Sequence, residues 1–174
     1  MSSKIILNHP RLKVVEDTVK LPSGKKTDYL RFEKSGTAPT AIVENEEKKF
    51  LVVREYFYVT NEWFFLLPGG YAEGEEESEV GIRRELEEET GVEVGELNLI
   101  GSFYSDIRRC SVQVPVFWAK KLFENDPKPD DEEQIEKYWM SEEEIDQLIK
   151  EDKFRNSFSL AAWAVFKCSK FSAS

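Results

Sequence analysis

The segment from Gly70 to Val92 constrains this chain more than any other part of its sequence. Its first half is glycine-rich, its second half is rich in helix formers, and Gly91 is placed to end the helix as a C-cap. In the predicted helix, Glu85, Glu88 and Glu89 stand at i, i+3 and i+4, so their carboxylates share one face. Like charges at this spacing, close to the negative helix end, destabilise the helix. The sequence therefore breaks a local stability rule here.

Clustered carboxylates require a compensating charge, and a divalent cation is the simplest one. Mg²⁺ prefers hard oxygen ligands and keeps several waters, so two or three carboxylates and substrate phosphate oxygens complete its shell. We therefore expect Mg²⁺ as the cofactor, with Mn²⁺ as a substitute. The alternative is that the acidic run is only the solvated face of a surface helix, which is the commoner role of such runs.

The spacing of the whole segment favours the metal site. The chain resembles the Nudix signature G-x5-E-x7-R-E-U-x-E-E-x-G-U at every fixed position, with these residues: Gly70, Glu76, Arg84, Glu85, Leu86, Glu88, Glu89, Gly91 and Val92. This resemblance to the Nudix hydrolases implies an α/β fold. We expect a Nudix α/β/α sandwich with a mixed sheet, the signature on a loop-helix-loop, and a small N-terminal antiparallel strand region.

The resemblance also implies which residues bind the metal. Glu85, Glu88 and Glu89 are the expected carboxylate ligands, and the backbone carbonyl of Gly70 or Gly69 is expected to add another. Glycines suit this role because their backbone can approach a cation closely. Gly70 could equally be only a turn residue.

Two further residues are catalytic candidates through the same resemblance. Arg84 is expected to position the neighbouring carboxylates by pairing with Glu76, although an ordinary salt bridge would give the same pattern. Glu133, in an acidic loop, is the first candidate for the general base, with a solvated loop carboxylate as the alternative. Glu136 is a weaker candidate, and Glu85 itself is the base in other branches of the family.

Beyond the signature, the chain resembles the ADP-ribose and nucleotide-sugar pyrophosphatase branch, notably in LVVREY, LPGG and NSFSLAA. Three departures leave the substrate open. Phe57 stands where the branch often has an arginine, Leu66 replaces the glutamate of E-L-P-A-G, and Arg108 replaces a proline of ADP-ribose enzymes. We expect Arg54, Tyr104 and Arg108 to bind substrate; the Tyr104–Arg109 segment could equally be an ordinary surface loop.

Turn residues and apolar periodicity divide the chain into two parts, a strand region at residues 1–38 and a Nudix domain at residues 39–174. By resemblance, the strand region is expected to be a dimerisation element. Ser78 is the expected N-cap of the signature helix, Ser141 with Glu144 forms a capping box, and Asn156 or Ser157 caps the last helix. The predicted strands lie in Ile5–Phe32, Thr40–Val43, Phe50–Val53, Trp63–Leu67, Leu97–Tyr104 and Ser111–Ala119.

Composition restricts the partners. A net charge of -10 and no basic patch argue against a nucleic-acid polymer, and no apolar run approaches the length of a membrane span. The first residues, MSSKIILNHPRLK, lack the apolar region of a signal peptide, so a cytoplasmic location is expected. The resemblance implies a small-molecule nucleotide substrate and a homodimer.

The expected function is Mg²⁺-dependent hydrolysis of the diphosphate bond in a nucleoside diphosphate derivative of ADP-ribose or nucleotide-sugar type. A water attacks phosphorus, and the products are a nucleoside monophosphate and a phosphorylated moiety. One alternative is a pyrophosphohydrolase that removes unwanted nucleoside triphosphates, which shares the signature. The other is a noncatalytic Nudix-fold binding module, which would typically lack signature carboxylates; this chain lacks none.

Overall fold

The computed structural model describes residues 2–33, 36–72, 76–127 and 134–171. By its internal contacts the chain forms two compact units. The smaller unit consists of Met1–Gly36 with Tyr104–Gln113, and the larger consists of Thr37–Phe103 with Val114–Ser174. The return of residues 104–113 to the smaller unit is not apparent from the sequence.

The smaller unit contains the predicted antiparallel sheet, with three strands in the order β1 (Ser2–His9), β2 (Leu12–Lys20) and β3 (Lys26–Phe32). The turns fall where proline and glycine predicted them, and Gly24 takes a positive φ of 85° in the second turn. The segment 104–113 joins this unit through a hydrogen bond from the Phe32 amide to the Arg109 carbonyl (2.7 Å).

The larger unit is built on a mixed sheet in the order β10-β5-β4-β9-β7, with β6 beside β5 and β8 beside β9. β4 and β9 run parallel, whereas the neighbours of β5 run antiparallel to it. The strands are β4 (Thr40–Glu44), β5 (Phe50–Phe57), β6 (Glu62–Leu66), β7 (Val92–Val94), β8 (Asn98–Tyr104), β9 (Gln113–Glu124) and β10 (Ile135–Met140).

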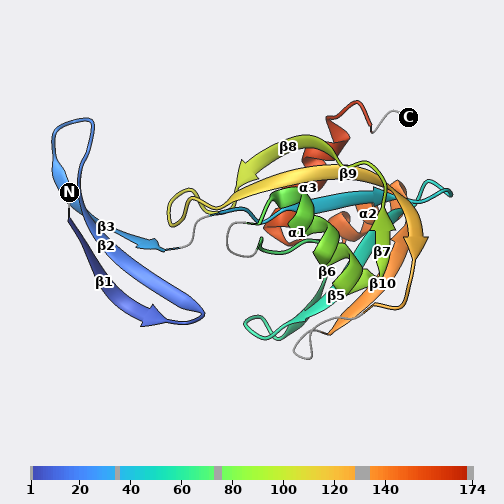
Figure 1. Cartoon of the computed structure of the whole chain (residues 1–174), viewed down its shortest axis with the longest axis horizontal. Coiled ribbons are helices and arrows are strands. Elements are labelled where there is room, and N and C mark those ends of the chain that lie inside the picture. The colour runs from blue at the N-terminus through green and yellow to red at the C-terminus, as the bar shows by residue number, and fades with distance from the viewer. Residues whose placement is uncertain (1, 34–35, 73–75, 128–133, 172–174) are drawn as a thin grey trace. The chain divides into compact units, whose positions relative to one another are not determined.

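Alternating side chains of the central strands divide between two cores, one on each face of the sheet. Ala41 and Val43 of β4 pack with Ile82 and Leu86 of the signature helix, while Ile42 packs with the C-terminal helices. Figure 1 shows α1 (Ser78–Glu85) on one side of the sheet and α2 (Glu142–Lys150) and α3 (Ser157–Lys167) on the other. The predicted fold class, an α/β/α sandwich with a mixed sheet and a small antiparallel sheet, is confirmed.

Of the three predicted helix N-caps, two are confirmed. The capping box of Ser141 and Glu144 is present, and the Asn156 side chain caps α3. Ser78, however, is not an N-cap: the N-cap is Glu77, and the Ser78 hydroxyl donates instead to Thr37 Oγ1 at 2.9 Å. The hydroxyl group of Ser78 thus makes a tertiary hydrogen bond to Thr37 and does not cap the helix.

Two strands were missed, β7 and β10. β10 follows a highly charged stretch, and its register along β5, with Ile135 opposite Glu55 and Met140 opposite Phe50, is what makes it a strand. Within the described part of the chain, no helix combines the length and apolar character that a membrane crossing requires.

Candidate active site

The signature helix changes form at its chemically important end. α1 ends at Glu85 and continues as a π-helix, η1 (Leu86–Thr90), so the prediction of one continuous α-helix is wrong in its last turn. The Thr90 hydroxyl donates to the Leu86 carbonyl (2.5 Å) and accepts from the Val92 amide (3.2 Å). Gly91, with φ 70°, ends the helix as the predicted C-cap. π-Turns inside helices occur frequently at functional sites.

The π-turn separates the environments of the signature carboxylates. Glu89 is buried, with 9% of its surface exposed, whereas the Glu88 side chain is 47% exposed. The Glu85 side chain lies between these extremes at 15%. The three glutamates therefore do not present one uniform acidic face, as continuous α-helical spacing would have given.

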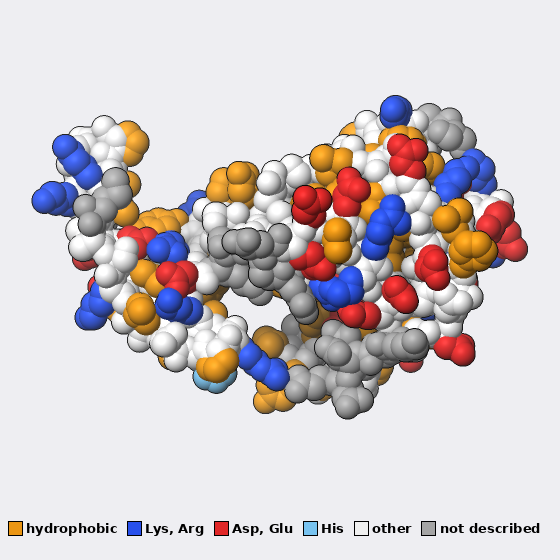
Figure 2. All heavy atoms as spheres, in the orientation of Figure 1, with side chains coloured by type: hydrophobic (Ala, Val, Ile, Leu, Met, Phe, Trp, Pro, Cys, Tyr) orange, Lys and Arg blue, Asp and Glu red, His pale blue; other side chains and the backbone are white. Residues whose placement is uncertain are grey.

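Arg84 links the acidic residues of the site. Its Nη1 lies 2.8 Å from Glu88 Oε2, and its Nη2 lies 3.0 Å from Glu85 Oε1. The predicted pair with Glu76 is also present, with Nη2 at 3.3 Å from Oε2. The hydrogen bond to Glu76, with those to the other carboxylates, holds the pKa of Arg84 well above its ordinary value despite partial burial. Figure 2 shows basic and acidic side chains interleaved over the face where Figure 1 places α1.

The Gly69-Gly70 pair explains how this turn packs. At Gly69, where φ is 154°, a Cβ would overlap the Pro39 carbonyl and lie 2.8 Å from Thr40 Cα. At Gly70, a Cβ would overlap the Glu85 carboxylate, with Oε2 only 2.7 Å away. The missing side chain at Gly70 thus lets a signature carboxylate rest against the backbone.

These residues fit a hard divalent cation in donor chemistry, since carboxylates and a glycine backbone come together. The arrangement in which Arg84 holds Glu85 and Glu88 is not itself a coordination shell. Among the residues that the structure describes, no group of three His, Cys, Asp or Glu side chains is placed to hold a metal ion. The metal assignment to Glu85, Glu88, Glu89 and Gly70 therefore remains a prediction.

Of the two loop candidates for the general base, Glu133 lies outside the described residues. Glu136 lies on β10, where it accepts hydrogen bonds from the Tyr138 hydroxyl (2.7 Å) and from Arg54 Nη1 (2.9 Å). These two bonds hold the pKa of Glu136 below its usual range. A carboxylate stabilised in its charged form is a weaker proton acceptor, so this geometry disfavours Glu136 as the base.

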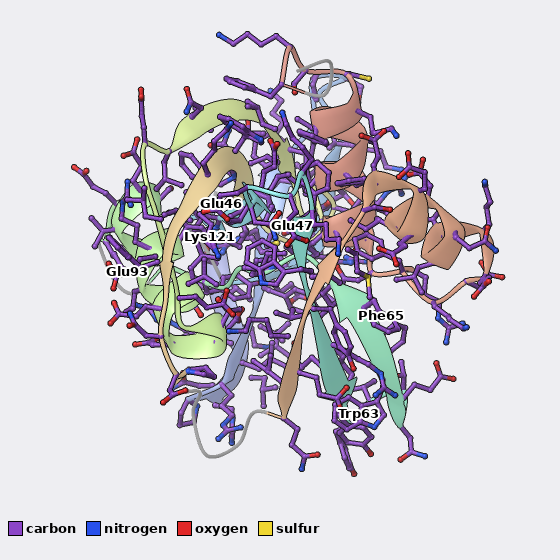
Figure 3. All side chains as sticks on the ribbon, turned by 90° about the vertical axis from the view of Figure 1, so that its right-hand side faces the viewer. Glu46, Glu47, Trp63, Phe65, Glu93 and Lys121 are labelled. Atoms are coloured by element: carbon purple, nitrogen blue, oxygen red, sulfur yellow. The ribbon has the colours of Figure 1, made fainter. Side chains whose placement is uncertain are left out.

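Arg54, a candidate for substrate binding, is placed on an aromatic surface of the larger unit. Its guanidinium lies over the Trp63 ring, 4.8 Å from the centroid, and within 5.8 Å of the Phe65 centroid. Both aromatic residues lie on β6 (Figure 3). Arg54 thus combines its ion pair with Glu136 and cation–π contacts, which together hold its planar group in one orientation. Its role in substrate binding remains a prediction.

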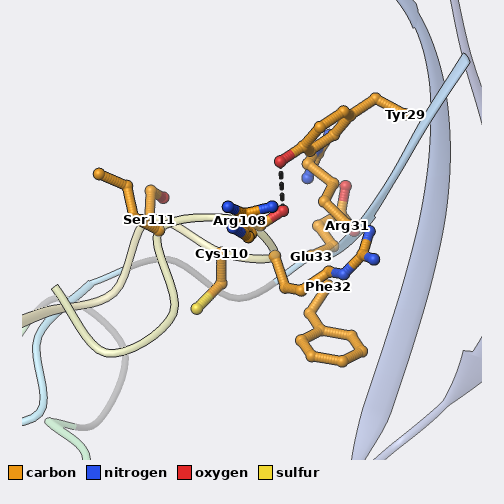
Figure 4. A pocket seen from close by; sticks show the side chains of 9 residues that line it. Tyr29, Arg31, Phe32, Glu33, Arg108, Cys110 and Ser111 are labelled. Atoms are coloured by element: carbon orange, nitrogen blue, oxygen red, sulfur yellow. Dashed lines mark hydrogen bonds between the residues drawn. The ribbon is translucent and has the colours of Figure 1, made fainter.

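Tyr104 and Arg108 belong to the smaller unit, where the Tyr104 side chain is exposed. Arg108 lines a cavity of about 290 Å³ together with Tyr29, Phe32 and Arg109, and the Tyr29 hydroxyl donates to the Arg108 carbonyl (Figure 4). This cavity combines aromatic and basic side chains from segments far apart in the sequence.

Sequence reasoning missed Lys137, which contacts the end of the signature helix. Lys137 Nζ donates to the Thr90 carbonyl (2.7 Å) and pairs with Glu124 Oε1 (2.8 Å). A cation at a helix C-terminus neutralises the exposed carbonyls there. The aromatic pair Tyr138-Trp139 is typical of a strand, but nothing in the sequence predicts the contact of Lys137 with Thr90.

Comparison with known proteins places the fold and the family of this chain. A solved structure described as an ADP compounds hydrolase superposes with a TM-score of 0.85 at 15% identity, covering 96% of this chain and 90% of that one. At that identity the likeness concerns the fold alone. The NUDIX domain family model matches residues 34–161, so the chain belongs to the NUDIX family, as the signature predicted.

Three curated proteins are similar to parts of this chain. The hydrolase of CMP-5'-(N-acetyl-N-hydroxy-3-aminopropyl)phosphonate from Streptomyces rubellomurinus is 33% identical over 42% of this chain and 35% of its own length. The ADP-ribose pyrophosphatase of Bacillus subtilis is 33% identical over 62% and 57%. The methanol dehydrogenase activator of Bacillus methanolicus is 28% identical over 87% and 82%. This chain therefore matches less than two thirds of the first two relatives.

Proposed function

We propose that this protein hydrolyses the diphosphate bond of a nucleoside diphosphate derivative, of ADP-ribose or nucleotide-sugar type, in a Mg²⁺-dependent reaction. The observation that carries the proposal is the packed signature turn, in which Arg84 joins Glu76, Glu85 and Glu88 while Glu85 rests on Gly70. The names of the Bacillus subtilis and Streptomyces relatives, both hydrolases of nucleotide compounds, support the substrate class.

The reaction forms a bond between a water oxygen and one phosphorus while the bond to the bridging oxygen breaks. The products are a nucleoside monophosphate and a phosphorylated moiety, and the leaving oxygen carries away the negative charge of the broken bond. When bound, Mg²⁺ supplies positive charge against the diphosphate oxygens and lowers the pKa of water. Glu85, Glu88, Glu89 and the Gly70 backbone would hold it.

The remaining residues of the proposal orient groups or transfer protons. Arg84 fixes Glu85 and Glu88 in place, and Glu85 or Glu133 accepts the proton of the attacking water. Arg54, Tyr104 and Arg108 bind the substrate, where guanidinium groups suit phosphate oxygens and an exposed tyrosine ring offers a stacking face.

The proposal extends to the setting of the enzyme. We infer a cytoplasmic homodimer that forms through the strand region at residues 1–38, with the Nudix domain at residues 39–174. The exposed apolar side chains of β1 and β3, among them Leu7 and Leu30, support a covering partner for this sheet.

Replacing Glu89 with Gln tests the central assignment. Glu89 is buried at the signature turn, and the substitution Glu89→Gln removes its charge but keeps its size. This variant should lower kcat by about two orders of magnitude while the fold persists. Hydrolysis of ADP-ribose and nucleotide sugars with Mg²⁺ would be followed by phosphorus NMR, and folding by circular dichroism.

Glu87→Gln is the matched control, because Glu87 lies in the same turn, is exposed and is not part of the signature. It should retain the wild-type rate. Equal rates in Glu89→Gln and Glu87→Gln would contradict the assignment. If the main activity were release of inorganic pyrophosphate from a triphosphate, the substrate class would be nucleoside triphosphates and not nucleoside diphosphate derivatives.

A further inference from the structure

A cavity of about 230 Å³ lies in the larger unit beside the glycine pair. The first residues of β4, the ends of β5 and β6, and the start of α3 surround it. Its lining includes the aromatic side chains of Phe57, Tyr71 and Phe158 together with Leu66. Its polar lining residues are Thr40, Glu55, Asn156 and Ser159. None of these residues occupies a fixed position of the Nudix signature.

The cavity adjoins the signature turn through one short backbone segment. Gly70 and Tyr71 both line it, and they are also the residues that meet the signature helix. Gly70 contacts the Glu85 carboxylate, and the Tyr71 carbonyl accepts from Arg84 Nη2 at 3.4 Å. A group bound in the cavity would therefore lie next to the segment that supports the proposed diphosphate site.

The lining selects against phosphate. Among the described residues that line the cavity, Glu55 is the only acid and none is Lys, Arg or His, so the lining offers a phosphate no cationic side chain. Phe57 and Leu66, which stand where the ADP-ribose branch often has an arginine and a glutamate, both line this same cavity. An uncharged group is expected instead.

Aromatic faces and a carboxylate define which uncharged group fits. Flat rings stack on the side chains of Phe57, Tyr71 or Phe158, and this contact tolerates any nucleobase. An ionised carboxylate only accepts hydrogen bonds, so Glu55 favours a base that offers an amino group. The volume lies below the 300–1,000 Å³ range typical of drug-sized ligands, which suits one ring system and not a whole nucleotide.

We propose that this cavity binds the amino-bearing nucleobase of the substrate, with Glu55 accepting a hydrogen bond from the exocyclic amine. The assignment rests on the proposed function for the position of the diphosphate. It makes Glu55 a specificity-determining residue that distinguishes an amino base from its oxo counterpart.

Binding of non-hydrolysable analogues tests the assignment without turnover. Titration calorimetry with Mg²⁺ would compare α,β-methylene-ADP with α,β-methylene-IDP, in which an oxo group replaces the amine. A hydrogen bond to a charged acceptor should favour the adenine analogue about tenfold or more. Glu55→Gln, which keeps the shape but can donate to an oxo group, should abolish that preference, while Glu62→Gln, a control on the neighbouring strand outside the lining, should keep it.

A second variant tests the aromatic wall. Phe158→Leu should weaken both analogues about tenfold, since base stacking is worth roughly 1–3 kcal/mol per base, and should leave binding of methylenediphosphonate, which has no ring, unchanged. Equal wild-type affinities for the two analogues, or unaltered binding in both variants, would overturn the cavity assignment. Wild-type discrimination without any hydrolysis would overturn the proposed function and leave the cavity assignment standing.

Discussion

Arg84 is the residue on which the order of the signature turn depends. One guanidinium contacts Glu76, Glu85 and Glu88, which would otherwise repel one another. The planar fork of arginine can meet several carboxylate oxygens at fixed angles, whereas a lysine ammonium is a point charge on a flexible stem. Resemblance predicted that Arg84 positions the neighbouring carboxylates by pairing with Glu76, but not that it also contacts Glu85 and Glu88 directly.

Replacement of Arg84 by Lys should therefore keep the positive charge but lose the simultaneous contacts with the three carboxylates. We expect Arg84→Lys to lower kcat/KM by about 10- to 100-fold and to raise the Mg²⁺ concentration needed for half-maximal activity. Steady-state kinetics across a Mg²⁺ series would measure both effects. Arg83→Lys is the control, since Arg83 donates to the carbonyls of Val94 and Gly95; it should lower Tm without shifting the Mg²⁺ response. A similar shift in both variants would argue against a positioning role for Arg84.

Among the elements, the π-turn η1 is held in place by a neighbouring strand. Lys137 of β10 donates to the Thr90 carbonyl and pairs with Glu124 of β9, so one ammonium connects the helix end to the sheet. Burial raises the pKa of Glu124, but hydrogen bonds from Lys137 and Trp139 outweigh burial and hold it below its usual value. The carboxylate is thus stabilised in its charged form by this network.

Lys137→Met keeps the apolar stem and removes the ammonium. The free energy of unfolding at pH 7 should fall by about 1–3 kcal/mol, because the carbonyl of the buried Thr90 loses a charged donor. Urea denaturation would measure this change. A carboxyl with a lowered folded pKa contributes stability above its unfolded pKa and loses it as pH falls, so the acid-side slope should also be shallower in this variant. Lys150→Met, at an exposed site on α2, should match wild type; a comparable loss there would count against the network.

The elements that local chemistry specifies were predictable from sequence. The three N-terminal strands follow from turn residues, the capping box from Ser141 and Glu144, and the C-cap from Gly91. The π-turn was not predictable, because π-helices are rare and the apolar spacing and C-cap of this segment are those of an ordinary α-helix. The cavity was missed since its lining comes from four separate segments.

At the scale of the whole molecule, the three-stranded sheet leaves apolar side chains exposed. Leu7 pairs with Val14 and Val14 with Phe32, so these three side chains form a row across all strands on one face. Leu7 is 45% exposed and Phe32 38%. An exposed apolar row of this kind is typical of an interaction surface, which supports the proposed homodimer.

Light scattering coupled to gel filtration tests the dimer. The wild-type protein should have about twice the 20.2 kDa mass of one chain, and Leu7→Glu combined with Leu30→Glu should give the single-chain mass because burying the new charges is unfavourable. Lys20→Glu, an exposed substitution in the same sheet, should leave the dimer intact. A wild-type mass of one chain at micromolar concentration would refute the proposal.

The glycine pair restricts how this protein could acquire a new substrate. A side chain at Gly69 would meet the Pro39 carbonyl and the Thr40 backbone, and one at Gly70 would displace the Glu85 carboxylate from its place in the signature turn. Any drift in base preference must instead come from strand and helix side chains such as Glu55, Leu66 and Phe158. A mutant library built to retune the enzyme should randomise those positions and keep both glycines fixed.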